Sequence, residues 1–103
     1  MKLEELRAWL DAQNDGLGTM RAYYARCTDA VAEAEREAAA LQLLGLVTMR
    51  FVERYEGEPL YAPVAKAARE RLLDLTTQAA RAATAGPDAQ VDCLNALARA
   101  DLG

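Results

Sequence analysis

The residues best suited to chemistry in this sequence are three carboxylates spaced four apart, Asp29, Glu33 and Glu37. On a helix this spacing places them on one face, and hard cations prefer oxygen ligands of this kind. A working site also needs carboxylates that converge from other helices, whereas a solvated acidic face needs only the spacing. We therefore predict a solvated face, with no metal site and no cofactor.

Histidine is absent from the 103 residues. Its absence removes the commonest general base, the base of serine and cysteine triads, and the histidine ligands of carboxylate-bridged bundles. The two cysteines, Cys27 and Cys93, lie far apart in sequence, and we expect Cys27 to be a buried, reduced thiol. We predict no catalytic residue and favour a protein that is not an enzyme. An enzyme, or a bundle that binds a small ligand, is the second alternative.

Aromatic side chains fall into two groups, one near the N-terminus and one in the middle of the chain beside two arginines. Tyr, Trp and Arg are favoured at binding hot spots, although packing at the ends of thin helical layers also explains such rings. We predict that the partner-binding residues are Trp9, Tyr23, Tyr24, Arg50, Arg54 and Tyr55.

Apolar and small residues recur at alternating steps of four and three from Met20 to Tyr55. Only a helix puts such a series on one face, so the pattern predicts one long central helix over about 19–55, on the order of 50 Å in length. Gly45 lies inside it, and we expect close packing at this glycine rather than a break. The stripe consists of Met20, Tyr24, Cys27, Val31, Ala34, Ala38, Leu41, Gly45, Thr48, Val52 and Tyr55.

A second long helix is predicted over about 61–84, because Gly57 and Pro59 end the first and a matching stripe follows. Short helices at both ends complete an all-α fold, an antiparallel helical hairpin within a bundle, as a single helical domain over 1–103. Matching the two stripes places Gly45 opposite Leu72 and Leu41 opposite Leu75.

A second apolar side of the central helix carries Leu44, Val47 and Phe51. Much of the 52% hydrophobic content is alanine, which buries little area per residue. Two short helices then leave part of this side uncovered. We predict a homodimer that buries Leu44, Val47 and Phe51.

The formal net charge of −4 disfavours a nucleic acid or an anionic membrane as the main partner. The sequence has no apolar run of membrane-spanning length and no signal peptide, so we expect a cytoplasmic protein. We predict a non-enzymatic module for protein–protein interaction, or a structural or regulatory helical module. The first alternative is an assembly or export chaperone that binds a partner's amphipathic helix.

Overall fold

A computed structural model, which describes residues 2–103, shows five α-helices and no strand within that range. The all-α prediction is confirmed, as are the long helix over 61–84 and the short helices at both ends. The helices are α1 (Lys2–Asp11), α2 (Leu17–Val31), α3 (Ala38–Tyr55), α4 (Ala62–Ala82) and α5 (Pro87–Arg99).

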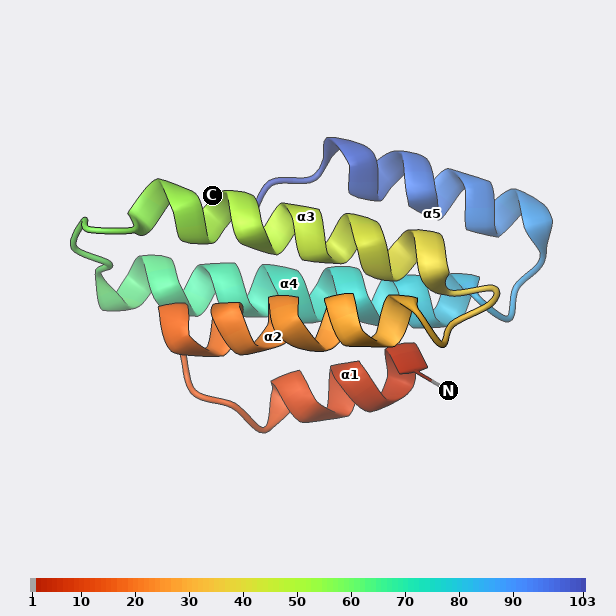
Figure 1. Ribbon diagram of the computed structural model, residues 1–103. Coiled ribbons are helices and arrows are strands. Elements are labelled where there is room, and N and C mark those ends of the chain that lie inside the picture. Colours follow the sequence, from red (N-terminus) through yellow and green to blue (C-terminus); the bar gives the residue numbers. More distant parts are fainter. Residues whose placement is uncertain (1) are drawn as a thin grey trace.

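The central helix predicted over 19–55 is wrong in its length. α2 ends at Val31, α3 begins at Ala38, and the chain reverses over residues 32–37. α3 then continues unbroken through Gly45, as predicted. Figure 1 shows α2 and α3 side by side and antiparallel, and this pair has the most extensive contacts between helices in the structure. The long apolar stripe is therefore folded onto itself.

Long-range packing explains this reversal, because residues 32–37 contain neither glycine nor proline. Helix propensities of ordinary residues differ by less than about 0.7 kcal/mol, whereas full burial of one large apolar side chain stabilises by about 1.5–3 kcal/mol. Folding back lets Tyr23, Cys27 and Leu41 become buried, each with at most 1% of its surface exposed. Burial of these side chains in the tertiary structure therefore outweighs the local helix propensity of residues 32–37.

The reversal is tied to the start of α1 by two acidic side chains. The backbone amide of Leu3 donates to Glu37 Oε1 at 2.7 Å, and Lys2 Nζ lies 3.0 Å from Glu33 Oε2. The first amides of a helix have no partner within it, so Glu37 caps α1 from a distant part of the chain. Two of the three candidate metal ligands thus have structural partners.

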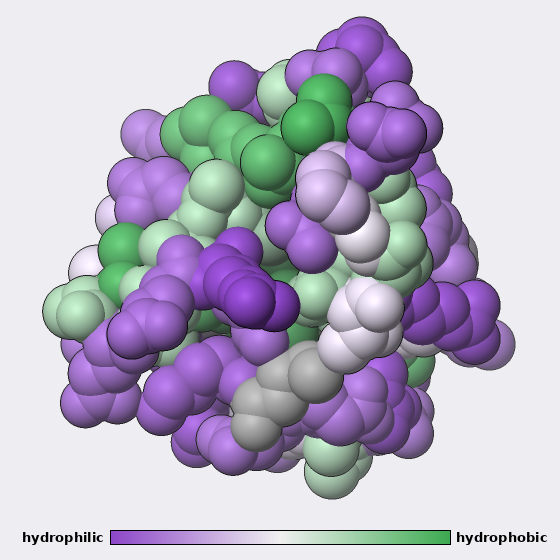
Figure 2. Space-filling view, turned by 90° about the vertical axis from the view of Figure 1, so that its right-hand side faces the viewer, coloured by the Kyte–Doolittle hydropathy of each residue, from purple (hydrophilic) through white to green (hydrophobic). Residues whose placement is uncertain are grey.

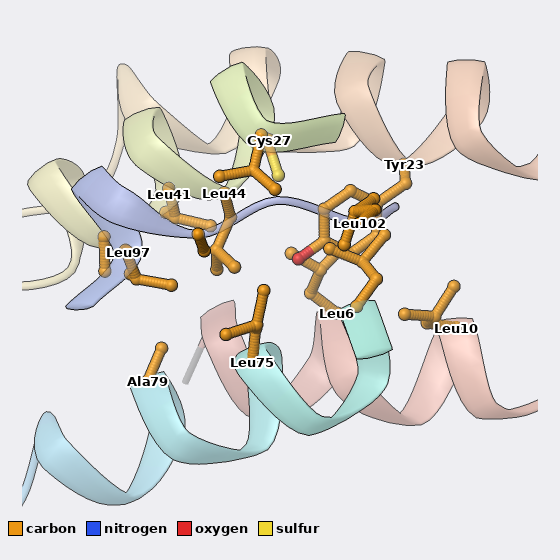
Figure 3. Packing of buried hydrophobic residues seen from close by; sticks show 14 of the residues in the cluster. Leu6, Leu10, Tyr23, Cys27, Leu41, Leu44, Leu75, Ala79, Leu97 and Leu102 are labelled. Carbon is orange, nitrogen blue, oxygen red and sulfur yellow. The ribbon is translucent and has the colours of Figure 1, made fainter. Parts of the chain in front are cut away.

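α1 and α5 lie on opposite outer sides of the α2–α3 pair, with α4 completing the bundle (Figure 1). α1 packs mainly on α4, and α5 packs on both α3 and α4, in a molecule of 40 × 23 × 20 Å. Leu41 and Leu75 both lie in the core cluster shown in Figure 3. The predicted partner of Gly45 is wrong, because Gly45 lies against α2 instead of Leu72.

The face chosen for a homodimer is not on the surface of the chain. Leu44, Val47 and Phe51 are 0%, 2% and 2% exposed. They are covered because the fold-back provides an additional helix and α5 packs on α3. The homodimer stays a prediction, but these three residues are not its exposed interface.

Polar side chains cover most of the end of the bundle where the chain reverses (Figure 2). Apolar atoms gather toward the upper edge of this view, on the side of α5, a helix on which Val91 is 56% exposed. Within residues 2–103, no helix combines the length and the apolar character needed to cross a bilayer.

Candidate functional site

An apolar groove with a volume of about 170 Å³ lies between α2 and α3. Both helices contribute to its lining, and none of the lining side chains is charged. The lining residues are Tyr24, Cys27, Thr28 and Val31 from α2, and Leu41, Gln42, Gly45, Leu46 and Met49 from α3.

α2 and α3 pack closely at Gly45. A Cβ atom at this position would lie 3.4 Å from Cys27 Cβ and 3.6 Å from Cδ1 of Tyr24. These are ordinary van der Waals distances, so α2 packs directly beside the glycine with room for no more than a Cβ atom. The expectation of close packing at Gly45 is confirmed, with α2 as the neighbour.

Leu46 is the most exposed of the large apolar side chains that line the groove, with 46% of its surface accessible. Tyr24, Val31 and Met49 are partly buried around the groove. Sequence analysis missed Leu46 as a site residue, although a signal was present. It lies on neither apolar side of the predicted central helix, so the sequence pattern alone leaves its side chain exposed. Together with Tyr24, Val31 and Met49 it forms an apolar edge of the groove, and such a grouped edge carries more information than a single exposed leucine.

Tyr23 points into the core instead of the groove (Figure 3). Its hydroxyl lies 2.7 Å from Thr76 Oγ1, and Thr76 Oγ1 donates to the Leu72 carbonyl at 2.7 Å. Because the Thr76 proton is used in that bond, Tyr23 is the donor to Thr76. Tyr23 is 0% exposed and therefore does not belong to the surface proposed below.

Burial also shifts the pKa values of two neighbouring groups on α2, the Tyr23 hydroxyl and the Cys27 thiol. It raises the pKa of Tyr23 well above its ordinary value and raises the pKa of the Cys27 thiol to about 12. Cys27 is therefore protonated at neutral pH, whereas the thiolate is the nucleophilic form of cysteine. Cys27 and Cys93 are both free, and the buried thiol expected at Cys27 is present.

The first predicted aromatic group is not a single cluster. The guanidinium of Arg26 lies 4.4 Å from the ring centroid of Trp9, between α1 and α2. Tyr23 faces the core, and Tyr24 faces the groove. Only Tyr24 of these three aromatics lines the groove.

The second predicted group is also divided. The ring of Tyr55 packs on Phe51 at a centroid distance of 4.8 Å, while Arg50 is exposed. Arg54 Nη2 donates to Asp101 Oδ2 at 3.1 Å, and Arg54 Nη1 also donates to the carbonyl of Gly103. Arg54 thus has a partner within the chain.

A hollow of about 270 Å³, lined largely by charged side chains, lies mainly between α1 and α2. Its lining includes Lys2 and Arg26, but Lys2 pairs with Glu33 and Arg26 stacks on Trp9. Across residues 2–103, no group of three or more side chains is placed to hold a metal ion. The hollow's basic groups are therefore engaged within the chain, Lys2 with the reversal at Glu33 and Arg26 with Trp9 of α1.

The chain matches no protein-family model, and neither curated proteins nor solved structures give a match. The α2–α3 groove is the stronger candidate site, because it combines an exposed apolar side chain with an uncharged recess.

Proposed function

We propose that this protein is a non-enzymatic interaction module whose α2–α3 groove binds the apolar face of a partner protein's helix. The observation that carries the proposal is the exposed Leu46 beside an uncharged groove. An amphipathic helix docks in such grooves through apolar anchors at helical spacing. The neutral lining favours a contact face without charges, because a buried, unpaired charge is costly.

The groove also suggests the length of the contact. Its lining spans residues 24–31 on α2 and 41–49 on α3, or about 10–12 Å along each helix at 1.5 Å per residue. That length is about two helical turns. We therefore expect a short contact made by two or three apolar anchors, with additional contacts at the rim setting specificity.

Three further expectations from the sequence are compatible with this proposal. An assembly or export chaperone would use the same contact, with release of the partner as a further step. A homodimer would place a second copy on the Leu46 face, because Leu44, Val47 and Phe51 lie in the core. A cytoplasmic location agrees with two free cysteines, since disulfides are rare in reducing compartments.

Site-specific photocrosslinking in the native cell tests the proposal. A photoreactive residue replaces Gln42 in the groove, and the matched control replaces Gln78, an exposed glutamine on α4. Each is tested alone and with Leu46→Glu, and mass spectrometry identifies the crosslinked peptides. Leu46 is 46% exposed, so Leu46→Glu should change the free energy of unfolding by about 0.5 kcal/mol or less.

The proposal predicts crosslinks from position 42 to an apolar helical segment, their loss with Leu46→Glu, and no corresponding crosslinks from position 78. If the captured segment comes from the same protein, the occupant is a second copy, and light scattering should show a dimer. Crosslinks from both positions to the same segments, or crosslinks from position 42 that persist with Leu46→Glu, would contradict the proposed groove.

A further inference from the structure

The last four residues described, 100–103, form a short strap that crosses α3 after α5 ends (Figure 1). Ala100 has an extended backbone, with φ −74° and ψ 152°. Ala100 and Leu102 are 7% and 6% exposed, whereas Asp101 and Gly103 are exposed. The strap therefore alternates buried and exposed side chains, as a bound extended peptide does.

Arg54 clamps the strap through its acidic residue. Its two terminal nitrogens lie 3.1 and 3.4 Å from the two carboxylate oxygens of Asp101. The Gly103 amide donates to Asp101 Oδ1 at 2.8 Å. This hydrogen bond from the Gly103 amide and the hydrogen bonds from Arg54 lower the pKa of Asp101. The positive charge of Arg50 contributes to the same shift. The site thus provides a bidentate carboxylate anchor within a basic environment.

Leu102 provides the apolar anchor. It belongs to the same core cluster as Tyr23 and Leu44, and Figure 3 shows it among these buried side chains. The clamp that holds it is exposed, because the side chains of Arg54 and Asp101 are 47% and 61% accessible. Exposed ion pairs of this kind hold weakly and are screened by salt. The strap is thus a well-fitted segment held at an exposed anchor.

We propose that residues 100–103 are a self-bound peptide, and that the recess beneath them accepts in trans an extended peptide with a carboxylate followed by leucine. Arg54 would hold the incoming carboxylate, and the recess filled by Leu102 would take the leucine. A small residue before the carboxylate is required, because Ala100 is buried. This site is separate from the α2–α3 groove and does not depend on the function proposed for it.

A binding competition with the chain's own strap tests this inference. The probe is a fluorescently labelled, C-terminally amidated peptide with the sequence of residues 99–103, Arg-Ala-Asp-Leu-Gly. Its anisotropy is measured with the full chain as wild type, Leu102→Ala and Asp101→Asn. Each weakened-strap variant is then combined with Arg54→Gln or with the control Arg71→Gln, whose arginine pairs with Asp74 on α4.

Leu102→Ala should tighten peptide binding by about tenfold or more, because the closed state no longer competes as well. Asp101→Asn should give a smaller gain of about two- to fivefold, because an exposed ion pair holds the strap only weakly. Arg54→Gln should abolish either gain, Arg71→Gln should not, and a probe with asparagine in place of aspartate should bind more weakly. If Leu102→Ala loses helical signal, Asp101→Asn carries the same test. Equal binding to wild type and the weakened-strap variant, no binding to that variant, or binding that is indifferent to Arg54→Gln would overturn the proposal.

Discussion

Tyr23 and Tyr24 are neighbours in sequence, but they belong to two different regions of the molecule. Tyr23 points into a sealed interior, where its hydroxyl bonds to Thr76 at 2.7 Å. Tyr24 points to the open groove beside Gly45 and Leu46. Successive residues on a helix are about 100° apart, so one helix can serve both regions.

The comparison separates a region that determines stability from a surface that we propose for binding. In residues 2–103, every fully buried side-chain nitrogen or oxygen has a hydrogen-bond partner, including the Tyr23 hydroxyl. The groove instead leaves Leu46 accessible at 46%. A satisfied interior resists change, whereas an exposed apolar edge stabilises little and is available for contact. Changes in the two regions should therefore have different consequences.

Replacing each tyrosine with alanine should have the largest and most unequal effect on stability. Tyr23→Ala should cost about 3–5 kcal/mol, because it leaves a large cavity in the core. Tyr24→Ala should cost about 1 kcal/mol, because its ring is only partly buried. Urea unfolding followed by circular dichroism measures both, and similar losses would show that the two regions are not distinct.

Thr76→Val should cost about 1–3 kcal/mol, because it leaves the buried Tyr23 hydroxyl without its acceptor. Thr76→Ser keeps the hydroxyl and should retain most of the stability. Thr48→Val is the matched control, since buried Thr48 bonds only the Leu44 carbonyl of its own helix at 2.8 Å. If Thr48→Val lowers the free energy of unfolding as much as Thr76→Val does, the Tyr23–Thr76 hydrogen bond contributes no more stability than a hydrogen bond within one helix.

Alkaline pH should destabilise the sealed region through Cys27. Its pKa is about 12 in the folded chain against an ordinary value of 9.0, so the unfolded state binds fewer protons between these values. The free energy of unfolding should therefore fall as the pH rises above 9, by up to about 1.4 kcal/mol per pH unit for this thiol. Tyr23 should add to the loss above its ordinary pKa of 10.0.

Cysteine variants isolate this alkaline effect. Cys27→Ala should reduce the fall in the free energy of unfolding between pH 9 and the folded-state pKa of about 12. Cys93→Ala should reduce it less, because Cys93 is more exposed. Urea unfolding between pH 8 and pH 11 measures how the free energy of unfolding changes with pH. This range includes the ordinary thiol pKa of 9.0. An undiminished slope in Cys27→Ala would contradict the assignment.

Much of the helical architecture follows from the sequence, because its signals are local. Gly57 and Pro59 separate α3 from α4, and apolar periodicity identifies α4. The close approach at Gly45 was predictable as well, because a glycine inside a long helix is otherwise costly. The reversal after Val31 was not predictable in this way, since no helix breaker marks it.

The assumption of one continuous helix also misplaced the predicted dimer interface. A continuous helix assigned Leu44, Val47 and Phe51 to an uncovered side, but folding back supplies the cover. Periodicity finds which residues share a face, but it does not show which faces meet. The position of Leu46 off the apolar sides was a usable signal, whereas the Arg54–Asp101 clamp joins residues too distant for spacing to reveal.

The central claim is that the chain folds back between α2 and α3, since this reversal creates both the sealed interior and the open groove. Nitroxide labels at exposed Arg21 and Glu53, in a Cys93→Ala background, test it by pulsed electron paramagnetic resonance. The fold-back predicts a separation well below the molecule's longest dimension of 40 Å. A continuous helix would separate these positions by about 48 Å, and that distance would contradict the account.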